Sequence, residues 1–292
     1  MSGELAALSG LLQLTPAQRE AVVRLRVGLW LGQDRKGFNV VVGSNGSGRV
    51  RLQVWAPAVT RIDALRGLPI DELSLDGTAV SDLSPLRGMG LKFLRMNRLP
   101  VSDLSPLVGM PLETLEIVGT EVEDIGPLRG MNLKVLSAGS CRIARMSVLA
   151  GMPLERLRIG SNSGQFDLRW VSSASLQELS LEHMGVRDIT VLRGKPLERL
   201  ELFGNSIADL SPLAGAPISY LSINRVSFTK GLSTLGELPL RELAIDRNAA
   251  VRLASILGEC PTLETVWVDQ EPLTLEEFRR QFPIKNANEK KR

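Results

Sequence analysis

Between Val80 and Leu133 the chain repeats one phrase three times with small changes. The copies read VSDLSPLRGMGLKFLRMNRLP, VSDLSPLVGMPLETLEIVGTE and VEDIGPLRGMNL, and each begins 21 residues after the one before it. A fixed period of this length indicates a solenoid, because one repeat can bury its apolar side only against the next. The period therefore limits the fold class more than any other feature of the chain.

The central phrase of each repeat is L-x-x-L-x-L, and we call one repeat a coil. We number positions within a coil from the first apolar residue of this phrase. A degenerate copy begins at Arg49 and keeps Leu52 and Val54. The other copies begin at Ile70, Leu91, Leu112, Leu133, Leu154, Leu176, Leu197, Ile218, Leu240 and Leu263. We therefore expect an array of about eleven coils over residues 49–270.

One coil shows why the repeat folds. Leu115 and Ile117 alternate with Thr114 and Glu116, which predicts a strand with one buried face. The phrase Asp-Leu-Ser-Pro-Leu then predicts a short helical turn, because aspartate or serine caps such a turn and proline suits its first position. Gly-Met-Pro ends the turn, since glycine adopts a left-handed backbone and proline prevents continuation.

The full phrase L-x-x-L-x-L-x-x-T-x-V-x-D-L-S-P-L-x-G-M-P resembles the leucine-rich repeats of bacterial internalin-type proteins. It is closer still to repeat arrays of planctomycete-type bacteria, which often accompany serine/threonine kinase domains. The resemblance covers roughly residues 49–275. It implies an α/β leucine-rich repeat solenoid: a right-handed horseshoe with a parallel concave sheet, short helical or 3-10 turns on the convex side, and helical caps at both ends.

The ninth position departs from this family, which usually has asparagine there. In this chain it is Thr78, Thr120, Cys141, Asn162, Met184, Asn205, Val226 and Asn248. Asparagine side chains at this position satisfy backbone groups of the loop, so we expect the ladder to be interrupted and the affected turns to be less rigid.

Both ends carry signals for caps, which a solenoid needs to cover its terminal coils. Thr15-Pro16-Ala17-Gln18 begins a predicted helix over about 15–31, with Val22, Leu25 and Leu29 at helical spacing. An independent docking helix is the alternative. Residues 1–48 form the N-terminal cap, residues 271–283 a capping helix begun by Thr274, and residues 284–292 a disordered tail. Residues 1–13 are weakly patterned and predicted to be loosely docked.

Two segments allow a structural and a functional interpretation. The glycine-rich residues 43–48 lie between Phe38–Val42 and Val50–Val54, so they predict a hairpin tip. A phosphate-binding loop should instead open a helix. In the sixth coil Trp170 replaces the proline and residues 161–170 carry an insertion. Trp170 either fills the resulting gap or stays exposed and anchors a partner.

Composition argues against several function classes. The 35 basic and 32 acidic residues are scattered and aromatics make up 4%, which is unlike a nucleic-acid-binding surface. No apolar run reaches the length of a membrane span, and the first residues lack a basic start, so we expect a cytoplasmic protein. Internalins are secreted, so the resemblance does not carry localisation. Cys141 and Cys260 lie five coils apart, beyond the reach of a disulfide.

The sequence gives little indication of a catalytic site. His183 is the single histidine, Cys141 occupies an interior position, and no residue spacing matches a metal site or the kinase motifs. Arginines flanking Glu178 and Glu201 favour their ionised forms over acid catalysis. We therefore expect no enzyme activity, cofactor, metal or small-molecule substrate.

Function is expected on the concave sheet, where the side chains of positions three and five point outward. Arginine with exposed aromatic residues is typical of protein-binding surfaces, whereas alternating charges also serve to keep a sheet soluble. The candidate protein-binding residues are Arg156, Arg158, Glu178, Arg199, Glu201, Phe203 and Tyr220, with Phe93 and Arg95 as a second group. We expect a non-enzymatic module that recognises an unidentified protein. The alternatives are a regulatory array serving a separate enzyme such as a serine/threonine kinase, and a structural assembly element.

Overall fold

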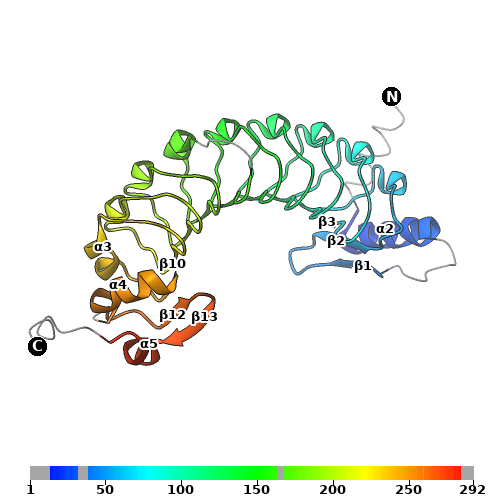
Figure 1. Cartoon of the computed structure of the whole chain (residues 1–292). Coiled ribbons are helices and arrows are strands. Elements are labelled where there is room, and N and C mark those ends of the chain that lie inside the picture. The colour runs from blue at the N-terminus through cyan, green and yellow to red at the C-terminus, as the bar shows by residue number, and fades with distance from the viewer. Residues whose placement is uncertain (1–13, 32–38, 163–166, 259, 284–292) are drawn as a thin grey trace, which may run out of the picture. The chain divides into compact units, whose positions relative to one another are not determined.

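The computed structural model describes residues 14–31, 39–162, 167–258 and 260–283 (Figure 1). Contacts divide the chain into two compact units, which we call unit 1 (up to Leu154) and unit 2 (from Glu155). The expected loose start at 1–13, Phe38, the inserted residues 163–166 and the expected tail at 284–292 lie outside the described residues.

Unit 1 is a stack of coils whose strands pair in parallel after an initial hairpin. β1 and β2 are antiparallel, and β2 to β6 then pair in parallel in chain order, with Leu73, Leu94, Leu115 and Leu136 in register. The hairpin confirms that residues 43–48 turn between two strands. The strands are β1 (Asn39–Ser44), β2 (Val50–Trp55), β3 (Glu72–Ser74), β4 (Phe93–Arg95), β5 (Thr114–Glu116) and β6 (Val135–Ser137).

Unit 2 repeats this arrangement and ends in a second antiparallel pair. β7 to β12 pair in parallel in chain order, and β12 pairs with the antiparallel β13. The strands are β7 (Arg156–Arg158), β8 (Glu178–Ser180), β9 (Arg199–Glu201), β10 (Tyr220–Ser222), β11 (Glu242–Ile245), β12 (Thr265–Val268) and β13 (Glu271–Thr274).

Short 3-10 helices return the chain in most coils. Their caps follow the sequence: Asp103 Oδ1 accepts the backbone N–H of Ser105 at 2.7 Å, and Asp188 does the same for Thr190 at 2.8 Å. Gly109 then ends the turn with φ +74°. The turns are η1 (Asp63–Leu65), η2 (Ser84–Leu86), η3 (Ser105–Leu107), η4 (Gly126–Leu128) and η5 (Ser147–Leu149) in unit 1, and η6 (Leu168–Ser173), η7 (Thr190–Leu192) and η8 (Ser211–Leu213) in unit 2.

The core of each unit is a stack of leucines, as the alternation predicts. Leu115 and Ile117 are completely buried, while Thr114 and Glu116 are partly exposed on the sheet face. Trp170 is only 7% exposed. It therefore lies in the core, and the alternative of an exposed aromatic anchor at this position is wrong.

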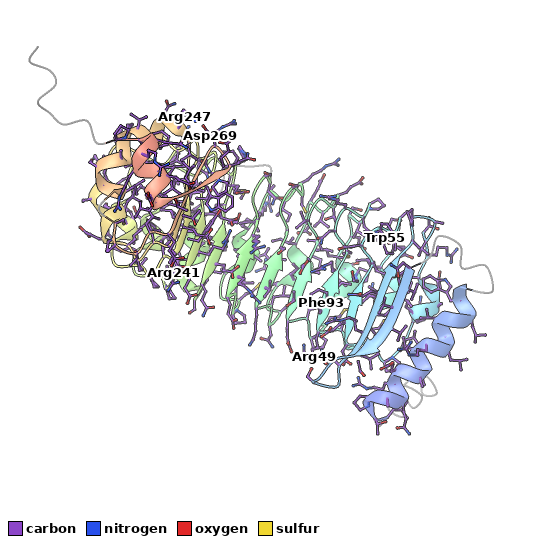
Figure 2. The ribbon with its side chains drawn as sticks, turned by 90° about the horizontal axis from the view of Figure 1, so that it is seen from below. Arg49, Trp55, Phe93, Arg241, Arg247 and Asp269 are labelled. Atoms are coloured by element: carbon purple, nitrogen blue, oxygen red, sulfur yellow. The ribbon has the colours of Figure 1, made fainter. Side chains whose placement is uncertain are left out.

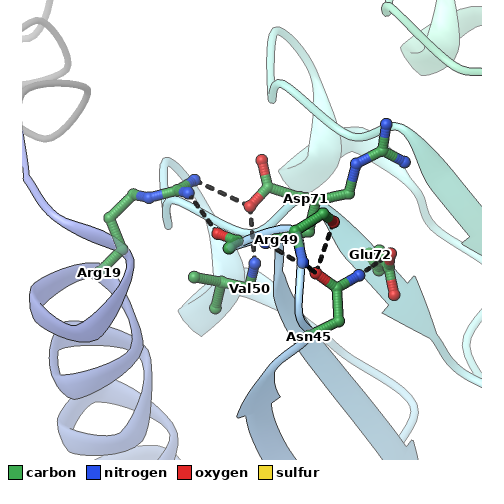
Figure 3. Close-up of polar contacts among 8 residues, drawn as sticks. Arg19, Asn45, Arg49, Val50, Asp71 and Glu72 are labelled. Atoms are coloured by element: carbon green, nitrogen blue, oxygen red, sulfur yellow. Dashed lines mark hydrogen bonds and ion pairs between the residues drawn. The ribbon is translucent and has the colours of Figure 1, made fainter.

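The N-terminal cap is fastened to the first coils by polar contacts (Figure 3). Arg19 of helix α2 (Pro16–Leu31) binds Asp71 at 2.8 Å and the carbonyl of Gly48, and Asp71 also accepts the N–H of Val50. At the hairpin tip, the side-chain amide of Asn45 donates to Glu72 at 2.9 Å.

The apolar face of α2 differs from the prediction. Val23 and Val27 are buried, whereas Leu25 and Leu29 are 67% and 72% exposed. Val23 and Val27 follow Arg19 by four and eight residues, so they share the helix face from which Arg19 reaches Asp71 and Gly48 in the first coils.

The last coils have longer return helices, α3 (Leu232–Glu237) and α4 (Arg247–Leu257). Helix α5 (Leu275–Gln281) closes the array, with Phe278 and Phe282 buried and a capping box between Thr274 and Glu277. It is shorter than the predicted 271–283 range because β13 precedes it. This strand was not predicted from the sequence.

The ninth-position ladder is interrupted, as expected. Asn205 Nδ2 donates to the carbonyls of Leu181 and Leu202, and its Oδ1 accepts two backbone N–H groups. Thr120 makes a single backbone bond, to Ile117. Asn248 was assigned to this ladder wrongly, because it lies exposed within α4.

Candidate protein-binding surface

Most of the residues proposed from the sequence lie on the strands of the sheet, with their side chains on the solvent side, and Phe203 lies in the turn after β9. Figure 2 labels Phe93 on β4 of unit 1, and it labels Arg247 and Asp269 in unit 2. Arg156, Arg158, Glu178, Arg199, Glu201 and Tyr220 lie in unit 2 and remain at least partly exposed. Each strand contributes one residue at position three and one at position five, so each coil determines its own part of the surface.

The ion pairs of unit 2 differ from a simple ladder along position three. Glu178 is in register with Arg156 and Arg199, but it pairs diagonally with Arg158 at 3.2 Å. Arg199 pairs within its own strand with Glu201 at 2.7 Å. Among the described residues, Arg156 has no ion-pair partner.

Two arginine–aromatic contacts hold the exposed rings in place. The Arg199 guanidinium carbon lies 3.5 Å from the centre of the Tyr220 ring, and that of Arg225 lies 5.6 Å from the Phe203 ring. His183 packs edge-on against Phe203 with ring centres 4.5 Å apart. The structure thus places Phe203 near Arg225 and Tyr220 near Arg199.

These aromatic rings border a hollow of about 620 Å³ in unit 2, which we call the aromatic hollow. Ser222 and Ala244 are buried at its base, because position five falls to small side chains between Glu201 and Trp267. The hollow is lined by Glu182, Phe203, Tyr220, Ser222, Asn224, Arg225, Ala244, Asp246, Trp267, Asp269 and Gln270.

Several of these residues were not among the sequence candidates. Glu182, Asp246 and Asp269 occupy position seven of their coils, together with Phe203 and Asn224. Only positions three and five were expected to point outward. If position seven is expected to do so as well, three acidic residues are found within five successive coils. Trp267 could have been found from the small residues that neighbour it at position five.

The aromatic hollow disfavours additional negative charge. Burial raises the pKa of Glu182, and the nearby Glu201 carboxylate adds to this, against the smaller effects of His183 and Arg199. Burial likewise raises the pKa of Tyr220 above its usual value. Glu182 has no ion pair or side-chain hydrogen bond with another described residue. Trp267 is held by its indole N–H, which donates to Glu242 at 3.0 Å.

The second candidate group lies beside a smaller hollow of about 290 Å³ in unit 1. Arg95 binds Glu116 at 2.7 Å and lies 5.5 Å from the Phe93 ring. The two carboxylates that line this hollow are already paired: Glu72 with Arg51, and Glu113 with Arg49 and Lys92. Both carboxylates of this hollow are therefore occupied by cationic partners within the chain.

The described part of the chain holds no group of three or more histidine, cysteine, aspartate or glutamate side chains placed to bind a metal ion. None of its helices combines the length and the apolarity that crossing a bilayer requires. Cys141 and Cys260 are buried free thiols.

No family model matches the chain, and no curated protein does so either. Solved structures do. An internalin (inlF) from Listeria monocytogenes is similar with a TM-score of 0.59 and 20% identity, over 72% of this chain and 71% of that one. An internalin C2 (inlC2) from the same species is similar with a TM-score of 0.54 and 28% identity, over 62% of this chain and 80% of that one.

The fold is a leucine-rich repeat solenoid. Parallel one-strand coils, 3-10 return turns and likeness to two internalins agree on this point. The resemblance of the sequence to bacterial leucine-rich repeat proteins is thereby supported, while the kinase-associated type stays a prediction. Leucine-rich repeat solenoids generally serve as scaffolds for protein interaction, because their exposed strands offer a broad and regular surface.

Proposed function

We propose that this leucine-rich repeat protein binds another protein through the strand face of unit 2, without catalysing a reaction. The observation that carries the proposal is the aromatic hollow, where Phe203, Tyr220 and Trp267 remain partly exposed around a depression of about 620 Å³. Tryptophan, tyrosine and arginine are enriched among the few residues that dominate protein-binding energies.

The surface is ordered before any partner arrives. β10 is paired on both sides, with Arg199 and Glu242 in register with Tyr220, and the Arg199 guanidinium lies on the tyrosine ring. Backbone and ring are therefore held without a ligand. Binding to such a surface costs little conformational entropy, which favours affinity.

The alternative interpretation, a charged face that only maintains solubility, accounts for part of this surface. The pair Arg158–Glu178 is substantially exposed, and such pairs contribute roughly 0–1 kcal/mol. Solubility does not account for Trp267 and Phe203, because exposed aromatic rings lower it. Recognition explains both the charges and the rings.

The experiment is site-directed photo-crosslinking with the full chain. A crosslinking phenylalanine analogue replaces Tyr220 in one variant and the exposed Arg193, on the return-turn side of its coil, in the control. Both are exposed to extract of the native host, and products are identified by mass spectrometry. We expect a protein captured from position 220 and absent from position 193. Capture from 193 alone would contradict the proposal.

A second variant separates recognition from stability. Arg156, Arg158 and Arg199 are changed together to alanine; all three lie on the solvent side of the sheet, so the fold should persist. We expect loss of the captured partner with an unchanged circular dichroism spectrum. A folded triple variant that keeps every partner would exclude this patch.

The identity of the captured protein distinguishes the alternative functions. A serine/threonine kinase would assign a regulatory role to the array. A second copy of this chain would assign a role in assembly. A protein of another class supports a recognition module in its own right.

A further inference from the structure

We infer that the aromatic hollow receives a lysine or arginine side chain of the partner polypeptide, with its cationic group at Glu182 and its stem against the aromatic rings. This inference rests on the proposed function, because it names the chemistry of the partner at the proposed surface. Its central residue, Glu182, lies at position seven of its coil, outside the positions expected to point outward.

The charge of the lining favours a cation. The hollow is lined by three carboxylates, on Glu182, Asp246 and Asp269, and by one guanidinium, on Arg225. The formal balance of −3 and +1 is −2, in a chain whose net charge is +3. The negative charge is therefore a local property of this hollow.

Among the three carboxylates, Glu182 is the one available to a ligand. Asp246 accepts the backbone N–H groups of Arg225 and Ala249, so it caps α4. Asp269 lies 3.8 Å from the Arg247 guanidinium. Glu182 has no such partner in the described part of the chain, although it is half-buried. Partial burial of a carboxylate without an ion-pair partner is unfavourable, and an incoming ammonium or guanidinium group reduces this penalty.

The walls of the hollow suit the rest of such a side chain. Lysine and arginine bury their methylene stems on apolar surface and keep the charged end in a polar environment. Tyr220, Phe203 and Trp267 supply this apolar surface, and their ring faces also attract cations. Trp267 is fixed for this purpose by its bond to Glu242.

The hollow of unit 1 provides an internal comparison. It is lined by Arg49, Arg51, Lys92 and Arg95 against Glu72 and Glu113, a balance of +4 and −2, or +2. Both of its carboxylates already have cationic partners. The two hollows therefore have opposite preferences, and only that of unit 2 should accept a basic side chain.

The test uses the full chain and three capped pentapeptides of glycine and serine that differ in the central residue: lysine, norleucine or glutamate. The indole N–H signal of Trp267, assigned by its loss in Trp267→Phe, reports binding in NMR titrations at millimolar peptide. We expect a saturable shift with the lysine peptide only. Equal shifts with norleucine, a stronger shift with glutamate, or no shift with lysine would each overturn the inference.

Paired variants assign the effect to charge. Glu182→Gln keeps the shape of the side chain and should weaken the lysine peptide about tenfold, the effect of losing one charge-assisted bond. Arg225→Gln removes the competing cation and should strengthen binding. The control Glu113→Gln, in unit 1, should leave the titration unchanged. Structural damage would weaken binding in both hollow variants, so opposite changes identify an electrostatic cause.

The outcomes keep this inference separate from the proposed function. If Tyr220 crosslinks a partner whose capture is unaffected in Glu182→Gln, and the lysine peptide does not bind, the basic side chain is excluded while recognition stands. If the lysine peptide binds as expected but no protein is captured at position 220, the hollow is a cation site and the proposed function fails.

Discussion

The indole of Trp55 lies directly on Gly77. A Cβ atom added to Gly77 would lie 1.9 Å from Nε1 of Trp55, closer than any non-bonded contact allows. Gly77 also has φ +75°, which a glycine adopts without strain. Trp55 is position seven of its coil and Gly77 is position eight of the next, so the contact joins neighbouring coils. Two features therefore require glycine at position 77: the close approach of the Trp55 ring and the left-handed backbone.

Gly77→Ala separates these reasons when it is compared with Gly88→Ala. Gly88 has φ +73° and open space around its Cα, so alanine there meets backbone strain alone, on the order of 1 kcal/mol. At Gly77 we expect the same strain plus displacement of Trp55, with a larger loss of unfolding free energy and a changed tryptophan emission. Urea denaturation and fluorescence measure both. Equal losses and unchanged emission would show that the contact contributes nothing.

The buried face of a strand should dominate stability. Leu115→Ala is expected to lower the free energy of unfolding by about 2–5 kcal/mol, because Leu115 is completely buried and alanine leaves a cavity. Thr114→Ala, on the solvent side of the same strand, should change it by less than about 0.5 kcal/mol. Chemical denaturation of both variants is the measurement, and similar losses would mean that the strand faces are assigned wrongly.

Asparagine and threonine at position nine should differ in their contribution. Asn205→Ala leaves the backbone N–H groups of Met184 and Val186 and two carbonyls without their partner, so we expect a loss of about 2–4 kcal/mol. Thr120→Val removes one bond and should lower stability by about 1 kcal/mol. Thermal and urea unfolding compare the two. A loss at Thr120 as large as that at Asn205 would contradict the ladder.

The return turns should make the protein sensitive to acid. Hydrogen bonds from the backbone N–H and hydroxyl of Ser105 hold the pKa of Asp103 below its usual 3.8. A carboxyl whose pKa is lower in the folded state stabilises the fold above its unfolded pKa, and this contribution is lost as pH falls through the folded value. Stability should therefore fall below about pH 4.

Asp103→Asn checks this assignment, since its amide oxygen still accepts the bond from Ser105 but does not titrate. Its stability should fall less between pH 5 and about pH 3 than that of the unchanged chain. Asp188 and Asp209 have pKa values lowered by the same turn geometry. If the variant and the parent lose stability in parallel, these caps are not the acid-sensitive groups.

The sequence predicted the coil because each of its elements is local. Leucine spacing set the buried face at Leu115, aspartate set the start of the turn at Asp103, and glycine set its end at Gly109. These features depend on neighbours within one repeat or on an identical neighbour. The predicted face of α2 was wrong, because the buried face is defined by contacts between distant segments, such as that of Arg19 with Asp71, 52 residues away.

The candidate site was predictable only in part. Tyr220 and Arg199 follow from counting positions along a strand, but Glu182 and Asp246 belong to the turn beyond it. At position eight, successive coils adopt a left-handed backbone whether or not they have glycine, as Arg98, Ser140 and His183 do. Residue type alone does not indicate that conformation. The direction of position seven therefore required the structure.

The 21-residue step between β3, β4 and β5 has a consequence for how the length of this protein changes in evolution. Because consecutive coils share register and caps, unequal recombination between the near-identical copies beginning at Val80 and Val101 would add or delete a whole turn without altering the residues around Glu182 and Trp267. Lineages of this protein should accordingly vary in length within residues 80–133, while the carboxylates and rings of the later coils diverge only by point substitution.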